Sequence, residues 1–139
     1  MEAAVRTTKI TPRREYEKIV FFCVHNSCRS QIAEAPGRLL AGDKYEFFSA
    51  GTETKPCINK DAVRLMKKLY GIDMEKEQYS KTLDKIPMPD IAISMGCDVG
   101  CPYIGREFDD NWQLPDPTGK NDEAFIAVIK EIERRIRLM

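Results

Sequence analysis

The chain has 139 residues, 42% of them hydrophobic, which suits one compact domain and is too short for two. Lys plus Arg and Asp plus Glu both number 22, so the net charge is zero and gives no indication of a nucleic-acid surface. The longest apolar run, residues 19–24, is far shorter than the roughly 20 residues that a membrane helix needs. We therefore expect neither nucleic acid nor membrane as a partner.

The cysteine content indicates a reducing compartment. Five cysteines are an odd number in a chain large enough to fold without disulfides, and no signal-peptide pattern is visible. We expect a cytoplasmic protein. Residues 1–16 are polar and basic and are expected to form a flexible arm, with a single domain over residues 17–139.

Strand and helix signals alternate along the chain. Alternation of this kind implies parallel strand pairing, and it predicts a three-layer α/β fold with a four-stranded parallel sheet and helices on both faces. A ligand of such a fold binds beyond the carboxyl ends of the strands. The expected strands are 19–23, 45–49, 91–95 and, more weakly, 106–111, and the expected helices are 30–40, 60–70 between Asn59 and Gly71, and 122–138.

One residue conflicts with the first expected helix. Pro36 lies inside it, where a proline removes a backbone donor and costs on the order of 3 kcal/mol. We expect a kink or an early break of the helix at Pro36.

The segment between the first strand and the first helix carries the main chemical signal. It places a cysteine, Cys23, at the end of a buried strand and an arginine, Arg29, after five intervening residues at the start of a helix. A loop at this place can turn its backbone N–H groups toward one point and bind an anion there. The same field favours a thiolate at Cys23, and Arg29 offers a two-pronged donor. The alternative is that Cys23 is a buried structural cysteine near an unrelated arginine. The expected oxyanion-binding residues are Val24, His25, Asn26, Ser27, Cys28, Arg29 and Ser30.

A second pair of thiols follows the third strand. Cys97 and Cys101 come after its end, which in a parallel sheet lies at the same edge as Cys23. Their spacing is compatible with a disulfide. A zinc site is disfavoured because the chain has one His. The alternatives left are a redox relay and two unreactive apolar side chains.

These motifs resemble a known family. The run from Cys23 to Glu34 resembles the anion loop shared by low-molecular-weight protein tyrosine phosphatases and the thioredoxin-coupled arsenate reductases of the same fold. Gln31 is more similar to the reductase version, since the phosphatases usually carry Pro there. The similarity continues over about residues 18–137, through Phe48-Ser49-Ala50-Gly51, Ser94-Met95-Gly96-Cys97 and the segment from Trp112 to Gly119.

The resemblance implies catalysis in the 17–139 domain, with arsenate or a phosphate-like oxyanion as substrate. Cys23 would attack arsenic, and Asp116 would protonate the departing oxygen. Cys97 would then attack Cys23, arsenite would leave, and Cys101 would attack Cys97 to form a disulfide that thioredoxin reduces. Asp116 could equally be an ordinary loop acid.

The resemblance also implies a cation site, and it leaves other functions open. Some members of this fold bind a potassium ion, and the matching positions are Asn26, Glu34, Ser49 and Asp73. The alternative is that these positions form a surface pair that coordinates no ion. No tightly bound cofactor is expected.

The main competing activity is hydrolysis of phosphotyrosine or small phosphate esters. A third hypothesis is a non-catalytic oxyanion sensor.

Overall fold

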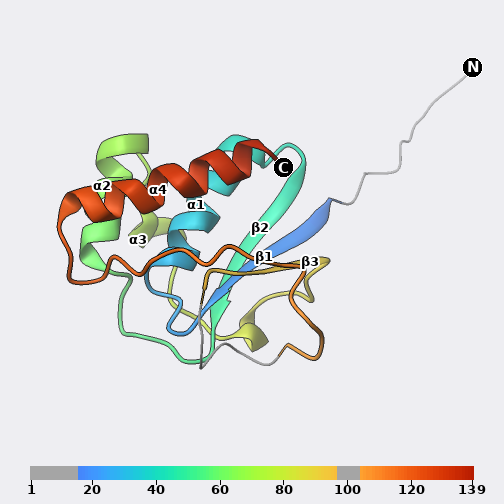
Figure 1. The fold of residues 1–139 in the computed structure, drawn as a ribbon. Coiled ribbons are helices and arrows are strands. Elements are labelled where there is room, and N and C mark those ends of the chain that lie inside the picture. Colours follow the sequence, from blue (N-terminus) through green and yellow to red (C-terminus); the bar gives the residue numbers. More distant parts are fainter. Residues whose placement is uncertain (1–15, 97–103) are drawn as a thin grey trace, which may run out of the picture.

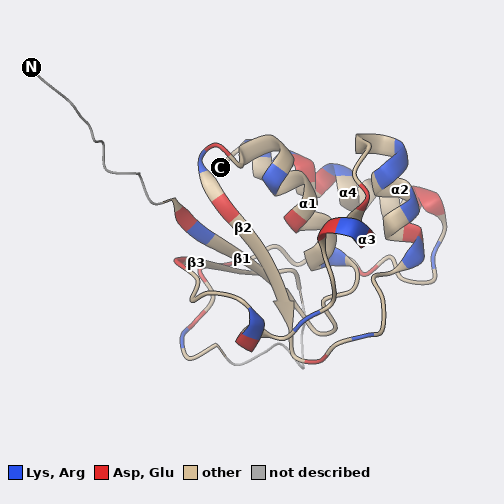
Figure 2. Cartoon of the chain, turned by 180° about the vertical axis from the view of Figure 1, so that it is seen from behind, with Lys and Arg blue, Asp and Glu red and all other residues tan. Residues whose placement is uncertain are grey.

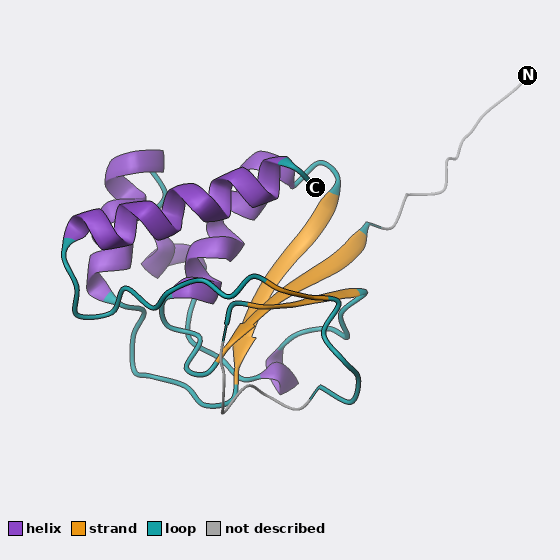
Figure 3. Cartoon of the chain, viewed as in Figure 1, coloured by secondary structure: helices purple, strands orange, loops and turns teal. Residues whose placement is uncertain are grey.

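The computed structural model describes residues 16–96 and 104–139 and contains a parallel sheet with helices packed on it (Figures 1 and 3). All strand pairs are parallel, and the strand order is β2-β1-β3-β4, which confirms the predicted four-stranded parallel α/β fold. The elements are β1 (Glu17–Cys23), α1 (Arg29–Ala41), β2 (Tyr45–Gly51), α2 (Lys60–Tyr70), α3 (Met74–Glu77), the 3-10 helix η1 (Leu83–Lys85), β3 (Ile91–Ser94), β4 (Asp110–Asn111) and α4 (Asp122–Arg137).

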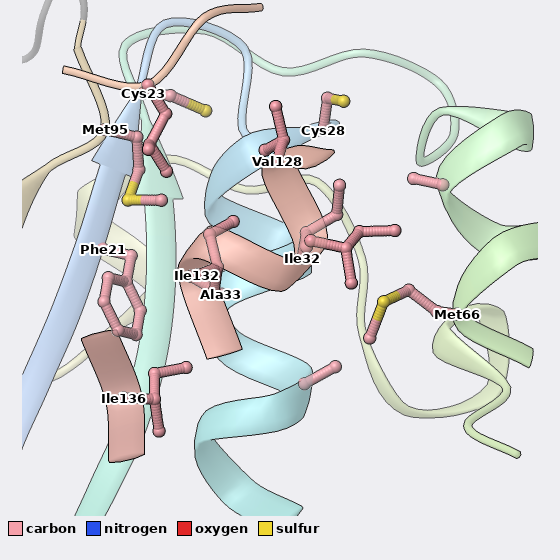
Figure 4. Close-up of a cluster of buried hydrophobic side chains, with 14 of the residues drawn as sticks. Phe21, Cys23, Cys28, Ile32, Ala33, Met66, Met95, Val128, Ile132 and Ile136 are labelled. Atoms are coloured by element: carbon pink, nitrogen blue, oxygen red, sulfur yellow. The ribbon is translucent and has the colours of Figure 1, made fainter. Parts of the chain in front are cut away.

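The main core lies between the sheet and helices α1, α2 and α4, which cover one face together (Figure 1). Strand β1 is one of the two inner strands of the sheet, and the side chains of residues 19–22 are essentially inaccessible to solvent. Burial on both faces explains why this strand is a continuous apolar run rather than an alternating one. The buried side chains of this core come from all three helices and from the strands (Figure 4).

The second face of the sheet carries a smaller cluster. Val20, Phe22, Ala50 and Ala92 form it, and partly buried side chains of the 86 and 104–108 regions pack against them. Within the described residues, the helical element near this face is the short η1. The layer on this side is therefore thinner than the layer formed by α1, α2 and α4.

Helix α1 continues through Pro36 to Ala41, so the early break that was one of the two expected effects of the proline does not occur. The proline and its neighbour Gly37 are both buried. A Cβ atom on Gly37 would come within 2.7 Å of the Phe47 ring, so helix and strand approach each other closely at this point. Packing on the sheet thus outweighs the local cost of the proline.

The other boundaries match the predicted elements to within a few residues, with exceptions in the short ones. Asn59 caps α2 by accepting hydrogen bonds from the next turn, and Gly71 ends it in the left-handed conformation, both as predicted. Strand β4 contains only Asp110 and Asn111, much less than the expected 106–111. The short elements α3 and η1 were not predicted.

Charged side chains are distributed over the helices with both signs interspersed (Figure 2). On α4, Glu131 and Glu133 pair with arginines three or four residues further along. None of the helices in the described ranges is both long and apolar enough to cross a bilayer.

Candidate active site

The loop between β1 and α1 lies at the carboxyl edge of the sheet, where β2 and β3 also end. Cys23 ends β1 and Cys28 precedes α1, so the two thiols lie at the same end of the core (Figure 4). Gly51 ends the neighbouring strand, and a Cβ atom there would come within 2.6 Å of the Val24 carbonyl oxygen. A residue without a side chain is therefore required at Gly51 for the loop to pack on β2.

The carbonyl groups of the loop all point outward. The Val24 oxygen accepts from the N–H groups of Thr52 (2.8 Å) and Glu53 (3.0 Å). The next three carbonyls accept, in chain order, from the Ser80 hydroxyl (2.7 Å), the Gln31 amide (3.0 Å) and the Asn59 N–H (2.7 Å).

Outward carbonyls fix the direction of the N–H groups. In a trans peptide, the N–H of the following residue points opposite to the carbonyl. The N–H groups of residues 25–28 therefore face the inside of the loop, next to the positive end of α1. The loop thus has the geometry of an anion-binding nest, and this geometry is held by α1 and by irregular segments that follow β2 and flank α2 and η1, rather than by the loop alone.

Asn26 keeps the loop in shape. It is fully buried and has a positive φ of 50°, the left-handed conformation that asparagine tolerates. Its Oδ1 accepts from the Gln31 amide (2.8 Å) and the Lys81 backbone N–H (3.0 Å), while its Nδ2 donates to Ser30 Oγ at 2.8 Å. Gln31, which the sequence associates with the reductases, thus acts here as a buried support for Asn26.

The nucleophile candidate lies at the inner end of this network. Cys23 Sγ is 2.9 Å from Ser30 Oγ, and the cysteine is 5% exposed. Since Ser30 Oγ already accepts from Asn26, its own proton is free to point to the Cys23 sulfur. A hydroxyl donor in this place stabilises a thiolate.

Arg29 and the 112–118 loop complete the site. Arg29 Nη1 donates to the backbone carbonyls of Met95 (3.0 Å) and Leu114 (2.6 Å), so the guanidinium joins the end of β3 to the loop that carries Asp116. A pocket of about 280 Å³ opens above Cys23. Its lining contains Cys23, Val24, His25, Ser27, Cys28, Arg29, Lys55, Asp116 and Thr118.

Asp116 lies in this pocket as a carboxylate. Burial acts against its charged form, but hydrogen bonds from the Thr118 N–H (3.0 Å) and hydroxyl (2.7 Å), with the nearby charges of Arg29 and Lys55, lower its pKa below the usual value. By contrast, burial raises the pKa of the Cys28 thiol to about 12. Cys28 is therefore a neutral thiol at physiological pH.

Anion binding is expected to change the protonation of Asp116. A dianion placed beside Cys23 repels the Asp116 carboxylate and raises its pKa, so binding takes up protons from solution. Sulfate is the suitable probe because it does not titrate near neutral pH. Calorimetry in buffers of different ionisation enthalpy, in a Cys23→Ser background that removes the thiol, should show proton uptake that falls when Asp116→Asn is added. Equal uptake in both proteins would contradict this coupling.

Most of the predicted site residues that the structure describes line one pocket. Cys97 and Cys101 lie outside the described residues. The described chain ends just before them at Gly96. The preceding residue, Met95, donates its N–H to the carbonyl of Phe22 (2.9 Å), the residue before Cys23. His25 lines the pocket and its Nε2 is 3.3 Å from Glu53 Oε1, in a solvent-exposed pair.

The side chains predicted for a potassium site have protein partners in the structure. Asp73 caps α3 by accepting from the Glu75 N–H (3.2 Å). Glu34 and Ser49 contact each other at 2.5 Å, and the side facing them holds the ammonium group of Lys81. These residues do not fit a bound potassium ion in this conformation.

Sequence reasoning missed Lys55, Thr118 and Lys81. The sequence does contain a signal for Thr118, because an aspartate followed two residues later by a threonine is typical of a turn closed by the carboxylate. The two lysines are on irregular segments and no spacing pattern marks them.

Known proteins of one family are similar to this chain. Residues 18–99 match the family described as low molecular weight phosphotyrosine protein phosphatase. The chain belongs to this family. It is 36% identical to arsenate reductase 1 of Staphylococcus epidermidis (85% of this chain, 91% of the relative) and 33% identical to a glutaredoxin arsenate reductase of Synechocystis (86% and 93%).

Solved structures of family members superpose on it well. An arsenate reductase in the phosphate binding state has a TM-score of 0.76 at 32% identity, covering 88% of this chain and 95% of the other. The thioredoxin-dependent arsenate reductase of Corynebacterium glutamicum has a TM-score of 0.67 at 31% identity, covering 94% of this chain and 61% of the other.

Proposed function

We propose that the chain is an arsenate reductase that converts arsenate to arsenite with electrons from a thiol-containing redox protein. The observation that carries the proposal is the pocket that joins a cysteine thiol, an inward-facing anion nest, Arg29 and Asp116. The relatives named arsenate reductase, at 31–36% identity over most of the chain, support arsenate as the oxyanion.

In the proposed reaction the Cys23 thiolate forms a bond to arsenic in the nest. Arg29 balances the negative charge, and Asp116, protonated once the anion is bound, gives its proton to the oxygen that leaves as water. The hydrogen bond from Ser30 favours the thiolate before attack.

The thiols of Cys97 and Cys101 then supply the two electrons. Cys97 attacks the Cys23 sulfur; a disulfide forms, the sulfur–arsenic bond breaks, and arsenite leaves with the bonding electron pair. Cys101 attacks the Cys97 sulfur, which frees Cys23 and leaves a Cys97–Cys101 disulfide. A dithiol of the thioredoxin class reduces this bond and restores the enzyme.

We place the enzyme in the cytoplasm, where such reductants are available and Cys23, Cys28 and Cys57 remain free thiols, as they are in the structure. Thioredoxin is the proposed reductant because a relative of similar fold is named thioredoxin-dependent. The relative named for glutaredoxin makes that protein the alternative to test.

The test is arsenate-dependent oxidation of NADPH, run once with thioredoxin and its reductase and once with glutaredoxin, glutathione and glutathione reductase. Hydrolysis of p-nitrophenyl phosphate is measured on the same preparation. We expect arsenate turnover with thioredoxin and a slow ester hydrolysis as a side reaction. Ester hydrolysis without arsenate turnover in either system would identify a phosphatase instead. Anion binding with neither reaction would identify a sensor.

A further inference from the structure

A buried carboxylate lies next to the anion loop and requires compensation. Glu34, on α1, is 1% exposed and faces β2. Its Oε1 accepts from the Ser49 hydroxyl at 2.5 Å, and its Oε2 is 2.6 Å from Arg38 Nη2. A buried charge of this kind is strongly destabilising unless cations and hydrogen bonds surround it.

The second cation is the ammonium group of Lys81. Lys81 is 7% exposed, which is rare for a lysine. Its Nζ is 3.5 Å from Glu34 Oε1, 3.4 Å from Ser49 Oγ and 3.2 Å from the Tyr79 carbonyl oxygen. A carboxylate, a hydroxyl and a carbonyl are the oxygen donors that also hold a hard monovalent cation, and the Tyr79 ring lies 5.1 Å from the ammonium on another side.

The charge balance leaves no role for a further ion. Arg38 and Lys81 together bring two positive charges to the single negative charge of Glu34. A potassium ion added beside Glu34 would be repelled by both. It would also have to displace the ammonium group from its oxygen ligands.

Lys81 is connected to the catalytic loop through its backbone. Its N–H donates to Asn26 Oδ1 (3.0 Å), and its carbonyl accepts from the Gly51 N–H (2.9 Å) at the end of β2. Asn26 in turn donates to Ser30, the partner of Cys23. The side chain that neutralises Glu34 therefore also fixes the segment that supports the loop.

We propose that Lys81 is a built-in monovalent cation, a positioning residue that replaces a dissociable potassium ion beside the anion loop. The chain then needs no potassium for stability or for anion binding. Removal of the ammonium group leaves the oxygen ligands of Glu34, Ser49 and Tyr79 in place, and these should accept a potassium ion from solution.

The first test uses the unmodified protein. Its thermal midpoint and its affinity for sulfate are measured in KCl, NaCl and choline chloride at equal ionic strength. We expect the midpoints to agree within about 1 °C, because no ion is bound. A saturable rise of the midpoint in KCl alone would overturn the proposal, and this test depends neither on the reaction nor on a variant that folds.

The second test removes the ammonium group. Lys81→Ala should lower the midpoint by roughly 10 °C in choline chloride, because a buried carboxylate loses one of its two cations. KCl should restore part of this loss and NaCl less. Lys68→Ala, which removes an exposed lysine from α2, is the control and should respond to neither salt.

A charge-neutral double variant completes the test. Lys81→Met leaves Glu34 with Arg38 alone, whereas Glu34→Gln combined with Lys81→Met removes the charge that needs compensation. The double variant should be more stable than Lys81→Met and independent of potassium. A Lys81→Ala protein as stable as its control, or one indifferent to potassium, would show that the ammonium group does not replace an ion.

Discussion

The Cys23→Ser protein is expected to bind sulfate and to have lost all arsenate turnover. A serine hydroxyl is a far weaker acid than a thiol, so the group 2.9 Å from Ser30 would be neutral and a poor nucleophile. Ester hydrolysis should fall on the order of 10⁴-fold or more, as for other nucleophile replacements. Arsenate reduction should vanish completely, since no sulfur remains at that position to form the disulfide that releases arsenite.

The control for this variant is Cys57→Ser. Cys57 is exposed and does not line the pocket, so its loss should leave both reactions near their original rates. Arsenate-dependent NADPH oxidation, ester hydrolysis and sulfate binding are measured on both proteins. Retained arsenate reduction in Cys23→Ser would overturn the assignment of the nucleophile.

The placement of Cys23 and Arg29 was predicted from the sequence pattern, whereas Asp116 was assigned to the site by the resemblance to the family; the topology of the sheet explains why all three lie together. A continuous apolar run marks a buried parallel strand, and parallel strands bring their carboxyl ends to one edge. Cys23 follows such a run directly, and Asp116 follows the last strand. Cys23 and Asp116 therefore lie at the same edge of the sheet, independently of the conformation of the loops between them.

The residues that shape the site could not be predicted in this way. The outward direction of the loop carbonyls depends on Thr52, Asn59 and Ser80, which lie on separate irregular segments. Lys81 belongs to a residue type that is rarely buried, yet it is 7% exposed and its Nζ is 3.5 Å from Glu34 Oε1. Contacts between such segments are decided by tertiary packing and leave no periodic pattern.

Pro36 failed as a signal for a helix break for the same reason. Its expected cost is real, yet α1 is held on the sheet by its buried residues on both sides of the proline. The short elements α3 and η1 are single turns, too short for a helical period to be visible. The extent of β4 was overestimated: the strand contains only Asp110 and Asn111, and the exposed Arg106 and Asp109 before it pair with each other at 2.6 Å.

The Cys97→Ser and Cys101→Ser proteins are expected to separate the two chemistries of the pocket. Ester hydrolysis needs Cys23, the nest and a water molecule, so both variants should hydrolyse p-nitrophenyl phosphate at nearly the original rate. Arsenate turnover should be lost in both, because the electrons come from thiols and not from water. Loss of ester hydrolysis in parallel would indicate a folding defect rather than a broken relay.

The species that accumulates distinguishes the position of each thiol in the relay. With Cys97→Ser no attack on Cys23 follows, so no arsenite is released. With Cys101→Ser one equivalent of arsenite is released and the protein stops as a Cys23–Cys97 disulfide, which mass spectrometry of peptides identifies. A Cys23–Cys28 disulfide in its place would refute the relay. The Cys28 thiol disfavours that outcome, because burial raises its pKa to about 12 and leaves it a poor attacking group at neutral pH.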